Sequence, residues 1–144
     1  MEIERKFTLK EVPDLSLYRH KELEQGYLCT DPTIRIRKED SKFYMTYKGH
    51  GTLAREEYNL PLNETAYYSL LPKADGRIIK KTRYLIPYDK FTIELDVFSN
   101  PEGLIFAEVE FESLEEANSF TPPEWFDKDV TDDPSYANSN ISKM

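Results

Sequence analysis

Cysteine is nearly absent from this sequence, which contains Cys29 and no other cysteine among its 144 residues. A single cysteine excludes an intramolecular disulfide and a zinc site of the kind built from several cysteines. Long apolar runs are absent too, because no stretch approaches the roughly 20 apolar residues that a membrane-spanning helix needs. The amino-terminal residues are charged and lack the apolar core of a secretion signal. We therefore expect a cytoplasmic protein with no disulfide framework and no membrane partner.

Positive charge is in deficit as well, since 19 lysines and arginines oppose 27 aspartates and glutamates and leave a net charge of −8. Generic nucleic-acid-binding proteins are usually basic, so we expect no nucleic-acid partner. An acidic chain is still compatible with metal cations and with a local basic site. Hydrophobic residues make up 39% and aromatic residues 13% of the sequence, a composition that argues against disorder. The length suits a single domain, which we expect to span residues 1–144.

Turn-forming residues divide the chain into segments that we expect to be strands. These segments cover residues 2–8, 22–29, 33–39, 42–48, 54–62, 77–87, 90–98 and 104–112. Because short turns join consecutive segments, we expect them to pair antiparallel, and eight such strands can close into a barrel without exposed edges. The expected helices cover residues 13–20, 63–71, 113–119 and 134–142. The predicted fold is therefore mainly β, an eight-stranded antiparallel barrel covered by a few short helices.

Charged and apolar residues alternate along these segments, so that one face of the strands collects the charges. That face carries seven acidic and seven basic residues, namely Glu2, Glu4, Glu57, Glu94, Asp96, Glu108 and Glu110, with Lys6, Arg35, Arg37, Lys48, Arg55, Lys81 and Arg83. Two architectures are compatible with this segregation. The charged face can look outward into solvent, as in a half-solvated antiparallel sheet, or the barrel can be inverted, with the charges lining a water-filled tunnel.

The signs of the charges favour the tunnel. The segment at 33–39 offers arginines to the charged face, whereas those at 90–98 and 104–112 offer carboxylates, and a solvated face would more usually mix signs because like neighbours repel. An enclosed lining of this kind needs water, counter-charges or ligands, since an ion moved out of water costs several kcal/mol. Basic walls that face acidic walls are suited to a polyphosphate with Mg²⁺ beside it.

Polyphosphate hydrolysis needs cations that hold the non-bridging oxygens, a divalent metal and an aligned water. Arginine forks meet phosphate bidentately and lysines act as point charges, so we expect the substrate to be bound by Lys6, Arg35, Arg37, Lys48, Arg55, Lys81 and Arg83. Mg²⁺ prefers hard oxygen ligands. The candidate metal ligands are Glu2, Glu4, Glu108 and Glu110.

The triplet Glu2-x-Glu4-x-Lys6 resembles the signature of the CYTH superfamily, the triphosphate tunnel metalloenzymes. The similarity continues through Gln25-Gly26-Tyr27-Leu28, Arg35-Ile36-Arg37, Tyr47-Lys48-Gly49, Arg55-Glu56-Glu57-Tyr58, Lys81-Thr82-Arg83-Tyr84, Glu94-Leu95-Asp96 and Ala107-Glu108-Val109-Glu110. It covers essentially the whole chain, and the tail at 130–138 looks like that of short, single-domain bacterial members. The resemblance implies an eight-stranded tunnel that binds a triphosphate and cleaves it with Mg²⁺ or Mn²⁺.

The resemblance also implies roles for individual residues. The substrate-contacting cations of the family match Lys6, Arg35, Arg37, Lys48 and Arg83, and its metal-binding carboxylates match Glu2, Glu4 and Glu110. The residues expected near a second metal or the attacking water are Glu94, Asp96 and Glu108. Lys81 matches a lysine linked to substrate positioning and phosphate release. Asn59 stands where many relatives carry an acid, which weakens a metal-ligand role at that position.

We therefore expect an inorganic triphosphatase that converts tripolyphosphate to pyrophosphate and phosphate by in-line attack of an activated water. A class IV-type adenylyl cyclase, or a nucleoside or thiamine triphosphatase, is the first alternative, although we find no clear mark of an adenine or thiamine site. A non-catalytic polyphosphate- or nucleotide-binding module is the second, and the retained carboxylates argue against it. Both a monomer and a homodimer are compatible with the sequence.

Overall fold

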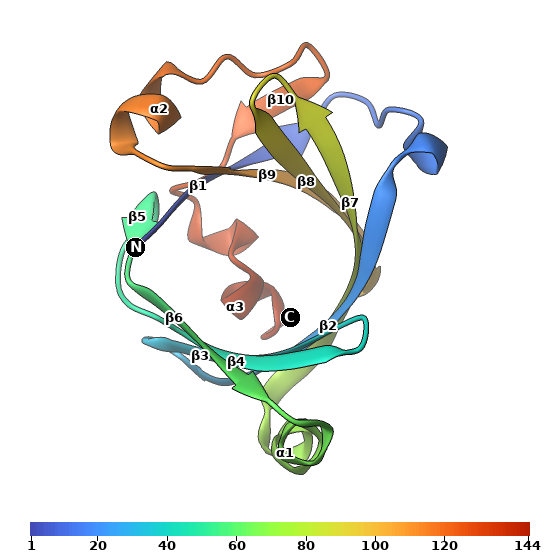
Figure 1. The fold of residues 1–144 in the computed structure, drawn as a ribbon, viewed down its shortest axis with the longest axis vertical. Helices are drawn as coiled ribbons and strands as arrows, with labels where there is room; N and C mark the ends of the chain where they lie inside the picture. Colours follow the sequence, from blue (N-terminus) through green and yellow to red (C-terminus); the bar gives the residue numbers. More distant parts are fainter.

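A single antiparallel sheet curves into a nearly closed barrel in the computed structural model, which describes residues 1–144 (Figure 1). Its ten strands are β1 (Glu2–Leu9), β2 (Arg19–Thr30), β3 (Thr33–Glu39), β4 (Lys42–Lys48), β5 (Ala54–Arg55), β6 (Glu57–Leu62), β7 (Asp75–Tyr88), β8 (Phe91–Asn100), β9 (Glu102–Phe111) and β10 (Phe126–Asp129). The fold class expected from the sequence is confirmed.

The strands follow the order β10-β1-β9-β8-β7-β2-β3-β4-β6, and β5 closes the ring by pairing with β1. Only Glu56 separates β5 from β6. These two strands therefore act as one interrupted strand that pairs with β1 at one end and with β4 at the other. If β5 and β6 are counted as one strand, the barrel has the eight strands that we expected. β10 is an additional strand beside β1 that we did not expect.

Short helices connect and cover the strands. They are η1 (Leu15–Leu17), α1 (Glu64–Leu70), η2 (Leu71–Lys73), α2 (Leu114–Ser119), η3 (Pro134–Tyr136) and α3 (Asn138–Ile141). Asn63 and Ser113 begin α1 and α2 by accepting backbone N–H groups at 2.8 and 3.1 Å, as N-cap residues do. None of the helices has the length and apolar character that a membrane-spanning helix requires.

The helix expected at 13–20 is wrong. One 3₁₀ turn forms at η1, and Arg19 and His20 already belong to β2, where they pair with Leu85 and Tyr84 of β7. Backbone pairing along the long β2–β7 ladder thus replaces the hydrogen bonds that a helix would have made. The longer β2 and β7 also extend beyond the expected strand ends.

The main hydrophobic core lies outside the barrel ring. Phe7, Leu95 and Val109 point outward from β1, β8 and β9 into a buried cluster, over which Figure 1 shows α2 and β10. Phe120 packs its ring against five other aromatic rings at centroid distances of 5.3 to 6.5 Å. Because this cluster buries the apolar face of the strands on the outside of the ring, the charged face of the same strands points into the barrel interior.

A second hydrophobic cluster closes one end of the barrel. Ile141 of α3 packs there with Tyr27, Ile79, Phe98 and Phe106. The carboxy-terminal segment is seen within the outline of the ring in Figure 1. The backbone N–H of Arg77 donates to the carbonyl of Ser142 at 2.5 Å, which ties the segment to the start of β7.

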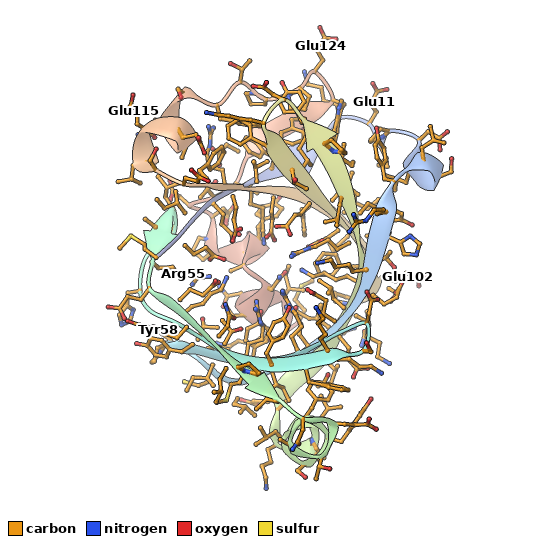
Figure 2. All side chains as sticks on the ribbon, in the orientation of Figure 1. Glu11, Arg55, Tyr58, Glu102, Glu115 and Glu124 are labelled. Carbon is orange, nitrogen blue, oxygen red and sulfur yellow. The ribbon has the colours of Figure 1, made fainter.

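Helices do not cover the whole apolar face, contrary to the expectation. Tyr58 and Leu60 of β6 are 65% and 54% exposed, and Tyr58 points away from the barrel in Figure 2. Phe43 of β4 packs against the rings of Tyr67 and Tyr68 of α1. The outer surface of β4 and β6 is therefore partly apolar and open to solvent.

Candidate active site in the barrel interior

The barrel encloses a cavity of about 1260 Å³, and Figure 2 shows side chains pointing into the ring from strands on all sides. Of the expected site residues, those that line the cavity are Glu2, Glu4, Lys6, Arg35, Arg37, Lys48, Arg55, Arg83, Glu94, Glu108 and Glu110. Lys81 and Asp96 do not. The inverted architecture is therefore the one that the chain adopts, with its ionic face enclosed.

Cross-strand register brings acidic and basic residues together on this face. Lys6 lies opposite Glu108 across β1 and β9, and its Nζ is 3.4 Å from Glu108 Oε1. Lys48 lies opposite Glu57 across β4 and β6, and its Nζ is 2.8 Å from Glu2 Oε1 and 3.4 Å from Glu57 Oε2. These ammonium groups partly compensate the burial of the carboxylates.

Three carboxylates converge where β1, β6 and β9 approach. Glu2, Glu57 and Glu110 each offer an oxygen atom, and these atoms lie within 4.8 Å of one another. Glu57 is absent from the metal-ligand set that we expected, and its inward strand position was the signal that could have added it. Which acids meet depends on barrel closure through the β5–β1 pairing, and the sequence pattern does not reveal that distance.

Two acids of this wall, Glu2 and Glu4, have raised pKa values, whereas the pKa of Glu57, which burial alone would raise, is lowered by the hydrogen bond with Glu2 and by the charge of Lys48. Burial raises the pKa of Glu2 to about 7, and the neighbouring Glu57 adds to the effect. Burial also raises the pKa of Glu4 to about 8, with the Glu108 charge as the next cause. Protons that stay on carboxylates near neutral pH mark a place where a cation would be favourable. All the donors are hard oxygens, so the residues fit a divalent cation of the Mg²⁺ type.

The opposite part of the wall is basic. Arg35, Arg37 and Arg83 are all buried. Burial lowers the pKa of Arg37, and the positive charges of Arg35 and Arg83 lower it further. Arg35 Nε is buried with no hydrogen-bond partner, which leaves a strong donor unsatisfied. An anion placed among these guanidinium groups would relieve the repulsion and supply the missing acceptor.

Arg83 is held rigidly. Its Nε and Nη2 donate to the two carboxylate oxygens of Asp96 at 2.8 and 3.0 Å, and its Nη1 donates to Glu94 Oε2 at 3.2 Å. Burial alone would lower the pKa of Arg83, but Asp96 and Glu94 hold it well above its ordinary value. A bidentate pair of this kind fixes the plane of the guanidinium as well as its charge.

Lys81 and Asp96, which we expected to contact substrate or the attacking water, lie outside the cavity lining. Their side chains are 0% and 1% exposed, with Lys81 Nζ 2.7 Å from Asp96 Oδ2. The Lys81 ammonium lies 5.1 Å from the ring centre of Phe98, which belongs to the cluster that closes this end of the barrel. Strand parity correctly placed both residues on the inner face, but both are fully buried, and Asp96 bridges Lys81 and Arg83. They support Arg83 from behind.

Several lining residues were missed by sequence reasoning. Lys6 Nζ donates to the carbonyl oxygen of Tyr136 at 2.8 Å, and the carboxy-terminal segment contributes Asn138 and Lys143 to the cavity wall. No pattern in the sequence signals that this segment folds back over the barrel end. The contact shows that it helps to hold Lys6.

Asn59 lines the cavity and takes part in a chain of hydrogen bonds. Arg35 Nη2 donates to Thr46 Oγ1 at 3.2 Å, Thr46 donates to Asn59 Oδ1 at 2.6 Å, and Asn59 Nδ2 donates to Glu57 Oε1 at 3.3 Å. Both ends of the Asn59 amide are therefore engaged. The amide connects the basic wall to the acidic cluster.

Comparisons with known proteins agree with this geometry. A family model described as "CYTH domain" matches residues 1–139. An inorganic triphosphatase of Nitrosomonas europaea is 40% identical over 98% of this chain and 96% of that protein, and one of Acetivibrio thermocellus is 37% identical over 99% and 93%. A crystal structure of an inorganic triphosphatase matches with a TM-score of 0.73 at 36% identity, over 100% of this chain and 95% of that chain. A Pyrococcus horikoshii protein, with a TM-score of 0.60 at 23% identity over 82% and 84%, shares the fold.

Proposed function

Because this chain belongs to the CYTH family, we propose that it is an inorganic triphosphatase, which hydrolyses tripolyphosphate to pyrophosphate and phosphate with Mg²⁺ or Mn²⁺. One observation carries the proposal: buried guanidinium groups and a carboxylate cluster line a single cavity inside the barrel. A phosphate-binding wall and a metal-binding wall are both needed for phosphoryl transfer, and neither stabilises an empty barrel. We further propose that residues 1–144 act as one domain, since one sheet carries the whole site.

The basic wall binds the triphosphate. Arg37 and Arg83 present planar forks to the non-bridging oxygens, and Arg35 contributes its unsatisfied Nε. The neighbouring point charges come from Lys6, Lys48 and Arg55. Because Arg83 is already fixed by Asp96, little side-chain freedom is lost when it meets the anion.

The acidic wall supplies the rest of the chemistry. Glu2, Glu57 and Glu110 would hold the divalent cation, with Glu4 opposite Glu110 across β1 and β9. When bound, this cation neutralises charge on the phosphoryl oxygens. Burial would raise the pKa of Glu108, but the charges of Lys6 and Arg83 hold it well below its ordinary value. Glu108 is thus an ionised carboxylate at the cavity surface, and we assign it the orientation of the attacking water.

A substrate panel tests the function. Tripolyphosphate, ATP, GTP and thiamine triphosphate are incubated with Mg²⁺, with Mn²⁺ and with chelator, and phosphate, pyrophosphate and cyclic AMP are measured. We expect metal-dependent release of phosphate and pyrophosphate from tripolyphosphate. Cyclic AMP would indicate the cyclase instead, and binding of tripolyphosphate without turnover would indicate a binding module.

Two variants show whether the cavity performs the reaction. Glu4→Gln should abolish turnover by disturbing the metal-binding wall, and Arg37→Ala should mainly raise KM for tripolyphosphate, about 10-fold or more. Glu56→Gln and Arg19→Ala alter exposed residues outside the cavity and serve as matched controls. Phosphate release that none of these changes affects would come from a contaminant and would contradict the proposal.

A further inference from the structure

Gln25 of β2 is a buried polar side chain to which the proposed mechanism gives no role. It is 0% exposed and lies outside the cavity lining, whereas its two hydrogen-bond partners line the cavity. Its Oε1 accepts from Arg37 Nε at 2.8 Å, and its Nε2 donates to the Tyr27 hydroxyl at 3.1 Å. Burying an amide is costly unless both of its ends are satisfied. Here both ends are satisfied by residues of the cavity wall.

The backbone holds Gln25 in this place. Gln25 pairs with Arg37 across β2 and β3, and Tyr27 shares its face because the two residues are two positions apart on one strand. Gly26 between them faces the opposite side, where an added Cβ would lie 2.8 Å from Ala74 Cβ. The strand is therefore pressed against the chain that follows η2, and it has little room to shift.

The chemistry of the partners fixes the orientation of the amide. Arginine has only donors, so the amide oxygen of Gln25 must face Arg37 and the amide nitrogen must face Tyr27. The Tyr27 oxygen is then an acceptor in this bond, and its own proton is left to point elsewhere. That hydroxyl donates to no protein group in the structure. In the same way, Nε of Arg37 is occupied by Gln25, so that a ligand would meet its terminal nitrogens, which lie beside the Tyr44 hydroxyl.

We propose that Gln25 is a positioning residue, which holds the Arg37 guanidinium and turns the Tyr27 hydroxyl so that both present donors to the bound triphosphate. The inference rests on the proposed function for the identity of the anion. Gln25 itself does not touch the substrate. Its contribution is to restrict two donors to one arrangement before the anion arrives, which lowers the entropy lost on binding.

The affinity for tripolyphosphate in chelator tests this role without requiring catalysis. Measured by calorimetry, Gln25→Leu should raise Kd about 10-fold, because a hydrogen bond to a charged group accounts for roughly one factor of ten. In an Arg37→Ala/Tyr27→Phe background the same change should alter Kd less than about 2-fold, since both targets are gone. A 10-fold loss in both backgrounds, or in neither, would overturn the proposal.

Two further measurements separate positioning from stability and from function. Ile86→Val, in the outer core, should lower the melting temperature without changing Kd, and Gln25→Met replaces Gln25→Leu if the latter does not fold. Wild-type protein that binds tripolyphosphate but releases no phosphate with metal would contradict the proposed function, while the comparison of Kd values still decides the role of Gln25. Wild-type protein that does not bind would overturn both.

Discussion

Behind the cavity surface, single residues of this barrel form two further layers. Arg83 lines the cavity, Asp96 forms an ion pair with Arg83 in the first layer behind it, and Lys81 forms an ion pair with Asp96 in the second. Alternation along the strands was sufficient to predict that all three face inward. It could not predict their depth, because depth depends on tertiary contacts such as that of the Lys81 ammonium with the ring of Phe98. Nor could alternation predict which acids Glu57 meets, because its neighbours Glu2 and Glu110 come from distant segments of the sequence.

Asp96→Asn tests the buried layer. The change leaves Lys81 without its counter-charge and Arg83 without its bidentate partner, and removing one member of a buried ion pair costs about 3–5 kcal/mol. We expect the free energy of unfolding, measured in urea, to fall by about that amount. Asp127→Asn, at an exposed carboxylate of β10, should change it by less than about 0.5 kcal/mol. A loss below about 1 kcal/mol for Asp96→Asn would contradict the supporting role of this residue.

At the scale of elements, the strands were largely predictable and their closure was not. The turn residues and the charge alternation located all eight barrel strands within a few residues, with β5 and β6 counted as one. The break at Glu56, by which one segment pairs with both β1 and β4, has no sequence signal. Nor does the return of α3 over the barrel end, which depends on contacts such as that of Ile141 with the second hydrophobic cluster.

Gly76 allows α3 to dock, and its substitution tests that contact. Its φ is +73°, and an added Cβ would collide with the carbonyl oxygen of Ser142. Gly103 also has a positive φ, +95°, but an added Cβ there meets nothing within 4 Å. Both alanine variants bear the cost of the left-handed backbone, so Gly76→Ala should lose about 1–3 kcal/mol more than Gly103→Ala through the clash. Equal losses in chemical denaturation would show that α3 does not dock as described.

At the scale of the whole molecule, the fold turns one set of charges towards the barrel interior and exposes part of its apolar surface. Part of the basic wall is compensated, because Asp96 and Glu94 pair with Arg83 and Asp96 also pairs with Lys81, while Arg35 and Arg37 still repel one another. Compensation is incomplete in the acidic wall, where the pKa values of Glu2 and Glu4 rise to about 7 and about 8. The empty barrel is thus stabilised by its outer core and weakened by its own site, as is usual where function sets the residues.

This imbalance predicts a pH dependence for the metal-free protein. Folded chains keep protons on Glu2 and Glu4 up to pH values of about 7 and about 8, whereas unfolded chains lose them near 4.5. The folded state therefore binds more protons in this window, so stability falls as pH rises from about 4.5 to about 8. Melting temperatures measured in chelator should decrease across that range, and Glu4→Gln should flatten the decrease. A melting temperature that rises towards pH 8 would contradict the assignment.

Below that window the sign reverses. Burial would raise the pKa of Asp96, but Arg83 and Lys81 hold it below its ordinary value. The stability that Asp96 contributes is thus present above the pKa of the unfolded chain and is lost as pH falls through the lower, folded pKa. Asp96→Asn should reduce this loss of stability at acid pH, and it should leave the decrease of the melting temperature between about pH 4.5 and pH 8 unchanged.

The central claim is that one cavity inside the barrel binds a triphosphate on its basic wall and a divalent cation on its acidic wall. A crystal structure of the protein with Mn²⁺ and a slowly hydrolysed tripolyphosphate analogue tests it most directly. Anomalous scattering should place Mn²⁺ among Glu2, Glu57 and Glu110, with the phosphate oxygens bonded to Arg37 and Arg83. A cation or analogue bound on the outer surface, with the interior filled by water alone, would contradict the account.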